Sequence, residues 1–249
     1  YLSSYGEWVY MPVHGTVWCP NVVPGWQPFY YGHWIWTDDD WAWTSYEPYG
    51  WLVYNCGFWG FDPGIGWFWV PGDAWYPARV QWYVFGDYVG WAPIPPPGIV
   101  WLDPWDPYVI DVWIVIDMDD FTREDVGSYR VDKPVYREIA SERKIIKRAP
   151  EVREVEDSTM RKVPVMEVVE RPVNIRRRTA PVQPSSSERA DTELKRIVLP
   201  KTEERKVEER AARIEKEVLT RRKDSADPPE RSSERSSGER QDSKKRRER

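Results

Sequence analysis

The sequence predicts an all-β domain of antiparallel hairpins, arranged as a meander or a small barrel, followed by a charged tail that is partly helical and partly disordered. Two observations predict this: a tryptophan repeat with a period near 25 residues, and a change of composition after residue 132. Residues 1–132 hold all 17 tryptophans and carry a formal charge of −14, from 3 Arg against 17 Asp and Glu. Residues 133–249 keep one aromatic side chain, Tyr136, and carry +9. This division indicates one folded domain with a charged appendage.

The tryptophan repeat consists of three parallel series. A Gly-x-Trp motif opens each unit, a second tryptophan closes it, and a third lies in each connection. The opening residues are Trp8, Trp34 and Trp59, the closing residues are Trp18, Trp43 and Trp69, and the connecting residues are Trp26, Trp51 and Trp75. A looser fourth unit runs from Trp82 to Trp91. Three series that share one period indicate a structural repeat.

Each unit has the pattern of a β-hairpin. Within a unit the aromatic period is two, as in Trp34 and Trp36, which places two indoles on one face of an extended strand. Turn-forming residues separate the strands at 12–15, 37–40 and 62–66. A lone hairpin is marginal in water, so we expect the units to stack on one another.

Two further elements are expected before the composition changes. The apolar run at 109–116 predicts one more buried strand, and residues 121–131 predict a short cap that closes the domain. The predicted domain therefore spans residues 1–132.

Three segments are expected in the tail: a charged, weakly extended linker region at 133–200, an amphipathic helix at 201–222 and a disordered charged segment at 223–249. The helix is predicted because Val207, Ala211, Ile214 and Val218 recur at helical spacing. Two heptads are too few for a stable coiled coil, so we expect a solvated, marginal helix.

Four stretches carry a resemblance to a known family. They are YGHWIWT at 31–37, EPYGW at 47–51, GWFWVPG at 66–72 and GWAPIPP at 90–96. Together they resemble the Trp-rich bacterial domain-of-unknown-function 6600 family, over roughly residues 5–135. Members of that family tend to be exported cell-envelope proteins, often downstream of a FecR-type β domain. The resemblance therefore implies an extracytoplasmic location, periplasmic or secreted, and it implies no activity.

Two cysteines, Cys19 and Cys56, leave two alternatives open. They bridge two repeats if the compartment oxidises them, or they are unpaired, half-buried thiols. Neither is part of the family pattern. The chain has no apolar run near 18 residues, so no transmembrane helix is expected. It begins at Tyr1 without Met, which is typical of a fragment or a processed chain.

Catalysis and metal binding have little support in the sequence. His14 and His33 are candidates for a general base or a metal ligand, but both lie beside repeat glycines and are expected to be ordinary hairpin residues. The acidic runs at 38–40 and 117–120 offer oxygen ligands for Ca²⁺ without an EF-hand pattern, so solvated turns are expected. We therefore expect no catalytic residue, no metal site, no cofactor and no enzymatic activity.

Aromatic side chains are the main candidates for binding. The faces of sugar rings are apolar and stack on Trp and Tyr rings, while nearby acidic groups accept hydrogen bonds from hydroxyls. Residues 1–132 contain 17 Trp and 13 Tyr, more than one small core usually holds, so some are expected outside. The connecting residues Trp26, Trp51 and Trp75 are the predicted aromatic platform.

The predicted function is that of a non-enzymatic structural or interaction module of the cell envelope, which contacts a wall glycan or an envelope protein through exposed aromatics. The alternative is an envelope tether whose basic tail binds an anionic polymer or a membrane surface. Nucleic acid is not expected as a ligand of the −14 part, because phosphates are repelled. An intramolecular contact between this part and the +9 tail is an equally good hypothesis for the role of the tail.

Overall fold

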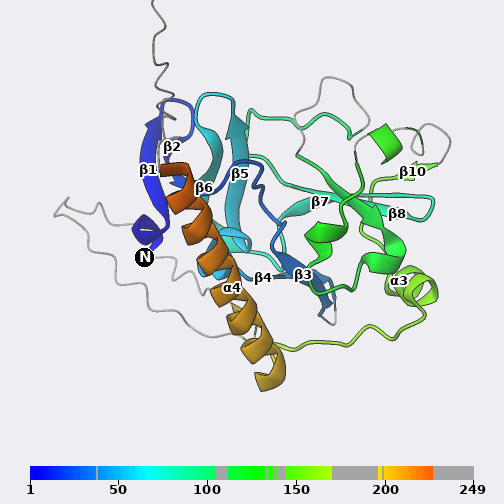
Figure 1. The fold of residues 1–249 in the computed structure, drawn as a ribbon. Coiled ribbons are helices and arrows are strands. Elements are labelled where there is room, and N and C mark those ends of the chain that lie inside the picture. Colours follow the sequence, from blue (N-terminus) through cyan, green and yellow to red (C-terminus); the bar gives the residue numbers. More distant parts are fainter. Residues whose placement is uncertain are drawn as a thin grey trace, which may run out of the picture.

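The computed structural model describes residues 1–37, 39–104, 112–132, 134–136, 138, 144–169, 196–197 and 199–226 (Figure 1). Antiparallel strands dominate the described residues up to 169, which we call the β-domain. Its strands are β1 (Gly6–Met11), β2 (Gly15–Pro20), β3 (Gly32–Trp36), β4 (Trp41–Ser45), β5 (Cys56–Asp62), β6 (Gly66–Trp75), β7 (Val80–Phe85), β8 (Tyr88–Pro93), β9 (Ile114–Asp117), β10 (Ile145–Ile146) and β11 (Val168–Val169). The helical elements are η1 (Leu2–Ser4), α1 (Gly50–Val53), η2 (Met118–Asp120), η3 (Val126–Tyr129), α3 (Val152–Thr159) and, beyond the β-domain, α4 (Lys201–Ala226). The predicted all-β class with an appended, partly helical tail is confirmed.

The tryptophan repeat corresponds to four hairpins: β1–β2, β3–β4, β5–β6 and β7–β8. In each hairpin the opening and the closing tryptophan face each other across the two strands. The pairs are Trp8 with Trp18, Trp34 with Trp43, Trp59 with Trp69 and Trp82 with Trp91. Directly opposed side chains are the stabilising unit of a sheet. The period near 25 residues is therefore the length of one hairpin plus its connection.

The glycine of each Gly-x-Trp motif leaves room for the closing indole. A Cβ on Gly6 would lie 2.6 Å from Nε1 of Trp18, and one on Gly32 would lie 2.5 Å from Cζ2 of Trp43. The third unit repeats this, with 2.7 Å between a Cβ on Gly57 and Nε1 of Trp69. Side chains essentially never approach this closely, so the motif requires glycine for packing.

The hairpins do not follow one another in a single sheet. β2 pairs with β6, so the first and third hairpins form a sheet of order β1-β2-β6-β5. The second hairpin, β3–β4, forms a two-stranded sheet, and the fourth lies in a sheet of order β10-β7-β8-β9. Aromatic rings join these sheets. Trp34 contacts the rings of Phe29, Trp43, Trp82, Trp91 and Phe121, which come from several of these elements.

The predicted late strand and cap are seen where the structure describes them. Of the segment 109–116, residues 112–116 are described and all are buried, with β9 paired to β8. The two 3₁₀ turns η2 and η3 follow, and Phe121 and Val126 are fully buried between them and the sheets. Residues 105–111 lie outside the described part of the chain.

The β-domain extends past residue 132, so the expected linker at 133–200 needs correction. The β10 strand adds to the edge of β7, and Nε1 of Trp41 donates a hydrogen bond to the carbonyl of Pro150 at 2.9 Å. Helix α3 follows, with Val155 fully buried and a capping box between Glu151 and Glu154. Residues 145–163 are thus part of the fold, because Ile145, Ala149, Val152, Val155 and Val163 pack in or against the aromatic core. This could not be seen from their charge-rich composition.

Helix α4 lies across the β-domain (Figure 1, orange). It begins at the predicted residue and continues to Ala226, past the predicted end at 222. Its apolar residues Val207, Ala211 and Ile214 are half-buried, so the expected solvated helix is instead docked. The rest of the predicted disordered segment, 227–249, lies outside the described residues. None of the described helices has the length and apolarity needed to cross a bilayer.

Candidate binding pocket beneath helix α4

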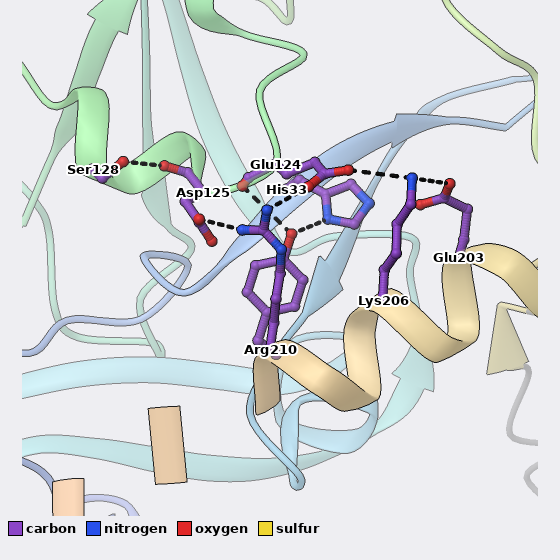
Figure 2. A network of polar contacts seen from close by, with 8 residues as sticks. His33, Glu124, Asp125, Ser128, Glu203, Lys206 and Arg210 are labelled. Atoms are coloured by element: carbon purple, nitrogen blue, oxygen red, sulfur yellow. Dashed lines mark hydrogen bonds and ion pairs between the residues drawn. The ribbon is translucent and has the colours of Figure 1, made fainter. Parts of the chain in front are cut away.

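Helix α4 is attached to the β-domain through Arg210 (Figure 2). The two ends of its guanidinium form ion pairs with the carboxylates of Glu124 and Asp125, and its central carbon lies 5.5 Å from the ring centre of Tyr46. One turn earlier, Nζ of Lys206 lies 3.4 Å from Glu124 and 2.9 Å from Glu203. Arg210 is therefore held by two carboxylates and an aromatic face at once.

The surface beneath Arg210 contains a buried histidine. Nδ1 of His33 and the hydroxyl of Tyr46 are hydrogen-bonded at 2.7 Å, and that hydroxyl also lies 3.4 Å from the carbonyl of Glu124. Burial lowers the pKa of His33 to about 4, against the opposing effect of nearby carboxylates. Burial likewise raises the pKa of Tyr46. Both groups are therefore neutral near pH 7.

Glu124 stays ionised because of its partners. Burial alone would raise its pKa, but the Arg210 charge and the hydrogen bond from Lys206 outweigh burial, so the pKa of Glu124 is lowered. The charged contact between α4 and the β-domain is therefore maintained at neutral pH.

A pocket of about 160 Å³ lies next to this contact, between α4 and the β-domain. Its walls on the β-domain side include five aromatic side chains: Tyr5, Trp26, Tyr31, Tyr46 and Tyr49. Ala211, Ile214 and Glu215 of α4 form the opposite wall. The pocket thus combines ring faces with a few polar groups, an arrangement typical of small-ligand sites.

Glu47 lies at the buried side of the pocket and accepts three hydrogen bonds from aromatic residues. Nε1 of Trp26 donates at 2.7 Å and the Tyr49 hydroxyl at 2.6 Å to one oxygen, while the Tyr54 hydroxyl donates to the other. Burial raises the pKa of Glu47, and these hydrogen bonds oppose that shift. The carboxyl group is therefore fixed in one orientation by its donors.

The predicted aromatic platform is not assembled as expected. Trp26 is only 6% exposed, because its indole reaches Glu47, so the expectation that it lies outside was wrong. Trp51 is half-buried and lines a second pocket of about 100 Å³ together with Val207 of α4. Trp75, also half-buried, ends β6 opposite Cys56. Of the three, Trp26 alone lines the larger pocket.

Other aromatic side chains are more exposed than the predicted ones. Trp8 is 42% and Tyr10 is 73% exposed, both on the edge strand β1. Trp8 belongs to the opening series of the repeat, which gave no reason to place it outside. Its exposure follows from the sheet order, because β1 has a neighbour on one side only among the described strands.

The two cysteines are free thiols in the structure. Strand β6 lies between their strands β2 and β5, so two spacings of about 4.8 Å separate the backbones. A disulfide needs Cα atoms within about 7 Å, which this arrangement does not offer. Burial raises the pKa of both thiols, that of Cys56 to about 11.

The two histidines lie apart from each other in the fold. His14 packs against the ring of Phe68 near the β1–β2 turn, whereas His33 lies under α4. Asp38 of the first acidic run is outside the described residues, and in the second Asp117 caps η2 through the amide of Asp119. Among the residues that the structure describes, no group of three His, Cys, Asp or Glu side chains gathers as a metal site would require.

Sequence reasoning missed most of the pocket. Tyr5, Tyr31 and Tyr49 lie outside the tryptophan series, and Glu47 stands out in the sequence only as the first residue of the motif at 47–51. The available signal was Glu47 between two tyrosines in the segment Tyr46-Glu47-Pro48-Tyr49. No local sequence pattern predicts the contacts of Arg210, because its ion-pair partners Asp125 and Glu124 lie 85 and 86 positions away.

Comparison with curated proteins and with solved structures gave no match. A family model does match, and the matched residues contain the four tryptophan hairpins just described. Residues 1–98 of the chain match the family of unknown function DUF6600, which confirms the resemblance over this part of the sequence.

Proposed function

We propose that the chain is a non-enzymatic interaction module of the cell envelope that binds one sugar ring of a wall glycan in the pocket between the β-domain and α4. The observation that carries this proposal is the composition of the pocket walls, in which Tyr and Trp rings surround a small space that also contains carboxyl and amide groups. The extracytoplasmic setting is supported by the family resemblance.

The size of the pocket favours a single ring. An apolar cavity of about 150 Å³ holds one benzene molecule, and this pocket has about 160 Å³, room for about one ring. A pyranose has apolar C–H faces and polar edges. Tyr31 and Tyr5 contribute aromatic rings to the lining, and Asn21 and Glu215 contribute polar groups. Such a mixture of stacking and a few convergent hydrogen bonds is typical of ligand recognition.

The chemistry of the pocket favours binding over turnover. Hydrolysis of a glycoside requires two carboxyl groups placed on either side of the bond. Two carboxyl groups line the pocket, Glu47 and Glu215, but both oxygens of Glu47 already accept hydrogen bonds from three aromatic donors. Glu47 therefore holds the pocket walls in place. This supports a binding role for the pocket.

The test is co-sedimentation of the full chain with purified peptidoglycan at low and at high salt. Ring stacking tolerates salt, whereas attraction by the basic tail is screened. We expect salt-resistant pelleting by the wild type and about tenfold weaker binding by Tyr31→Ala. Tyr10→Ala is the matched control, since Tyr10 is 73% exposed on β1 and is not a pocket residue.

Two results would count against the proposal. Pelleting at low salt only, unaffected by Tyr31→Ala, would assign binding to the basic tail and favour the tether function. Absence of pelleting under both conditions would exclude wall glycan as the ligand.

A further inference from the structure

Helix α4 supplies one entire wall of the pocket. Ala211, Ile214 and Glu215 face the aromatic side chains of the β-domain across it. If α4 detached from the β-domain, the pocket would lose this wall and become an open surface. A ligand that fills the pocket therefore contacts two parts of the chain that are far apart in sequence.

Ion pairs contribute to the attachment of α4 to the β-domain. Its described side chains are half-buried or exposed, and none is fully buried. Val207, Ala211 and Ile214 cover the β-domain incompletely, since both pockets remain beneath them. Exposed ion pairs contribute little and weaken with salt. The docked helix is thus held by a modest free energy, to which Arg210 contributes two ion pairs.

Arg210 joins α4 to the cap of the β-domain at one point along the helix. Its guanidinium joins Glu124 and Asp125, and the carbonyl of Asp125 accepts a hydrogen bond from the Ser128 hydroxyl at 2.7 Å within the cap (Figure 2). The pocket residues Ala211 and Ile214 lie one and four positions further along the same helix. The ion pairs of Arg210 therefore hold α4 next to the residues that form its wall of the pocket.

We infer that docking of α4 and binding of the sugar ring are coupled, with Arg210 as the positioning residue that completes the site. The inference rests on the proposed function. A ligand that contacts both walls binds the docked state more tightly than the undocked one, and it shifts the equilibrium toward docking by that difference. By linkage, a change that lowers the docked population weakens ligand binding in proportion to the population that is lost.

The experiment uses the full chain and two arginine variants. Arg210→Gln removes the ion pairs to the β-domain. Arg205→Gln is the matched control, because Arg205 is 78% exposed on the same helix and pairs with Glu209 of that helix. Hydrogen exchange of the α4 amides reports docking, and titration with a soluble N-acetylglucosamine oligosaccharide reports binding.

We expect Arg210→Gln to exchange α4 amides faster than the wild type and to bind the oligosaccharide about tenfold more weakly. Arg205→Gln should match the wild type in both measurements. Addition of the oligosaccharide should slow exchange in α4 of the wild type.

The outcomes separate the two proposals. If the wild type binds and Arg210→Gln binds equally well, the coupling is wrong while the proposed function survives. If Arg210→Gln binds more tightly, α4 competes with the ligand and the coupling is again overturned. If the wild type fails to bind the oligosaccharide, the proposed function fails and the coupling fails with it.

Discussion

His33 and Tyr46 form a buried hydrogen bond of 2.7 Å on the face that α4 covers. His33 lies on β3, and Tyr46 directly follows β4, the partner strand of β3 in the same hairpin. His33 pairs with Thr44 in the β3–β4 register, so Tyr46 lies two residues further on the same side. The imidazole is surrounded by Tyr46, Glu124, Asp125, Glu203 and Arg210, and its burial dominates its titration.

This relationship makes stability depend on pH. The pKa of His33 is about 4 in the folded protein and about 6.5 in the unfolded chain, so between these values the unfolded chain alone binds the proton. Above pH 6.5 the titration of His33 does not change the free energy of unfolding. As the pH falls from 6.5 toward 4, protonation of His33 in the unfolded chain lowers that free energy by on the order of 3 kcal/mol. Urea unfolding of wild type and His33→Gln across this range measures it. A stability difference that stays constant with pH would contradict the assignment.

Glycine in the repeat motif is expected to be indispensable for packing. In Gly6→Ala the new methyl group would lie 2.6 Å from the Trp18 indole, so we expect a loss of about 1–3 kcal/mol from overpacking. Gly64→Ala is the control, because Gly64 is exposed and its Cβ would meet only the Asp62 side chain, at 3.1 Å. That change should alter the free energy of unfolding by less than about 0.5 kcal/mol. Equal effects of both changes would refute the packing role.

The contact between Trp41 and Pro150 is expected to hold residues 144–169 on the β-domain. Trp41→Phe removes the indole donor and leaves the Pro150 carbonyl unpaired, at a cost of about 1–3 kcal/mol. Hydrogen exchange in 145–163 should become faster. Trp101→Phe is the control, since that indole donates to Pro93 and not to this segment. Unchanged exchange in Trp41→Phe would mean that other contacts hold the segment.

The cysteines are expected to react as two separate thiols. Alkylation needs the thiolate, and burial raises the pKa of Cys56 to about 11, while Cys19 is only half-buried. Iodoacetamide at neutral pH should therefore modify Cys19 before Cys56, and both after unfolding. Mass spectrometry of the peptides measures this order. A linked pair of cysteine peptides from the untreated protein would contradict it.

The hairpins were predictable because their signals are local. Trp8 and Trp18 lie ten positions apart and face each other, and the same relation recurs in the other units. The sheet order was not predictable, because the pairing of Trp18 with Trp69 depends on which hairpin faces fit together. Sequence period identifies the units, and side-chain complementarity selects their neighbours.

The candidate site was even less predictable from the sequence than the sheet order. Trp26 was expected outside because it lies in a connection, yet an indole N–H can be buried once it has an acceptor. Its acceptor is Glu47, in the next connection. Likewise the helical spacing of Val207, Ala211 and Ile214 predicted α4, but the carboxylates that receive Arg210 come from a cap far away in the chain. Both contacts arise only in the folded molecule.

The pairing of β2 with β6 also has a consequence for how the chain reaches this structure. The first hairpin is a local structure, but its neighbour β6 lies beyond the intervening hairpin β3–β4 in the sequence, so the β2–β6 pairing joins distant segments. Contacts between distant segments slow folding, because loop entropy is lost before they form. Until β6 arrives, β2 presents an unpaired edge with Trp18 uncovered. The early chain is therefore most prone to self-association during this interval.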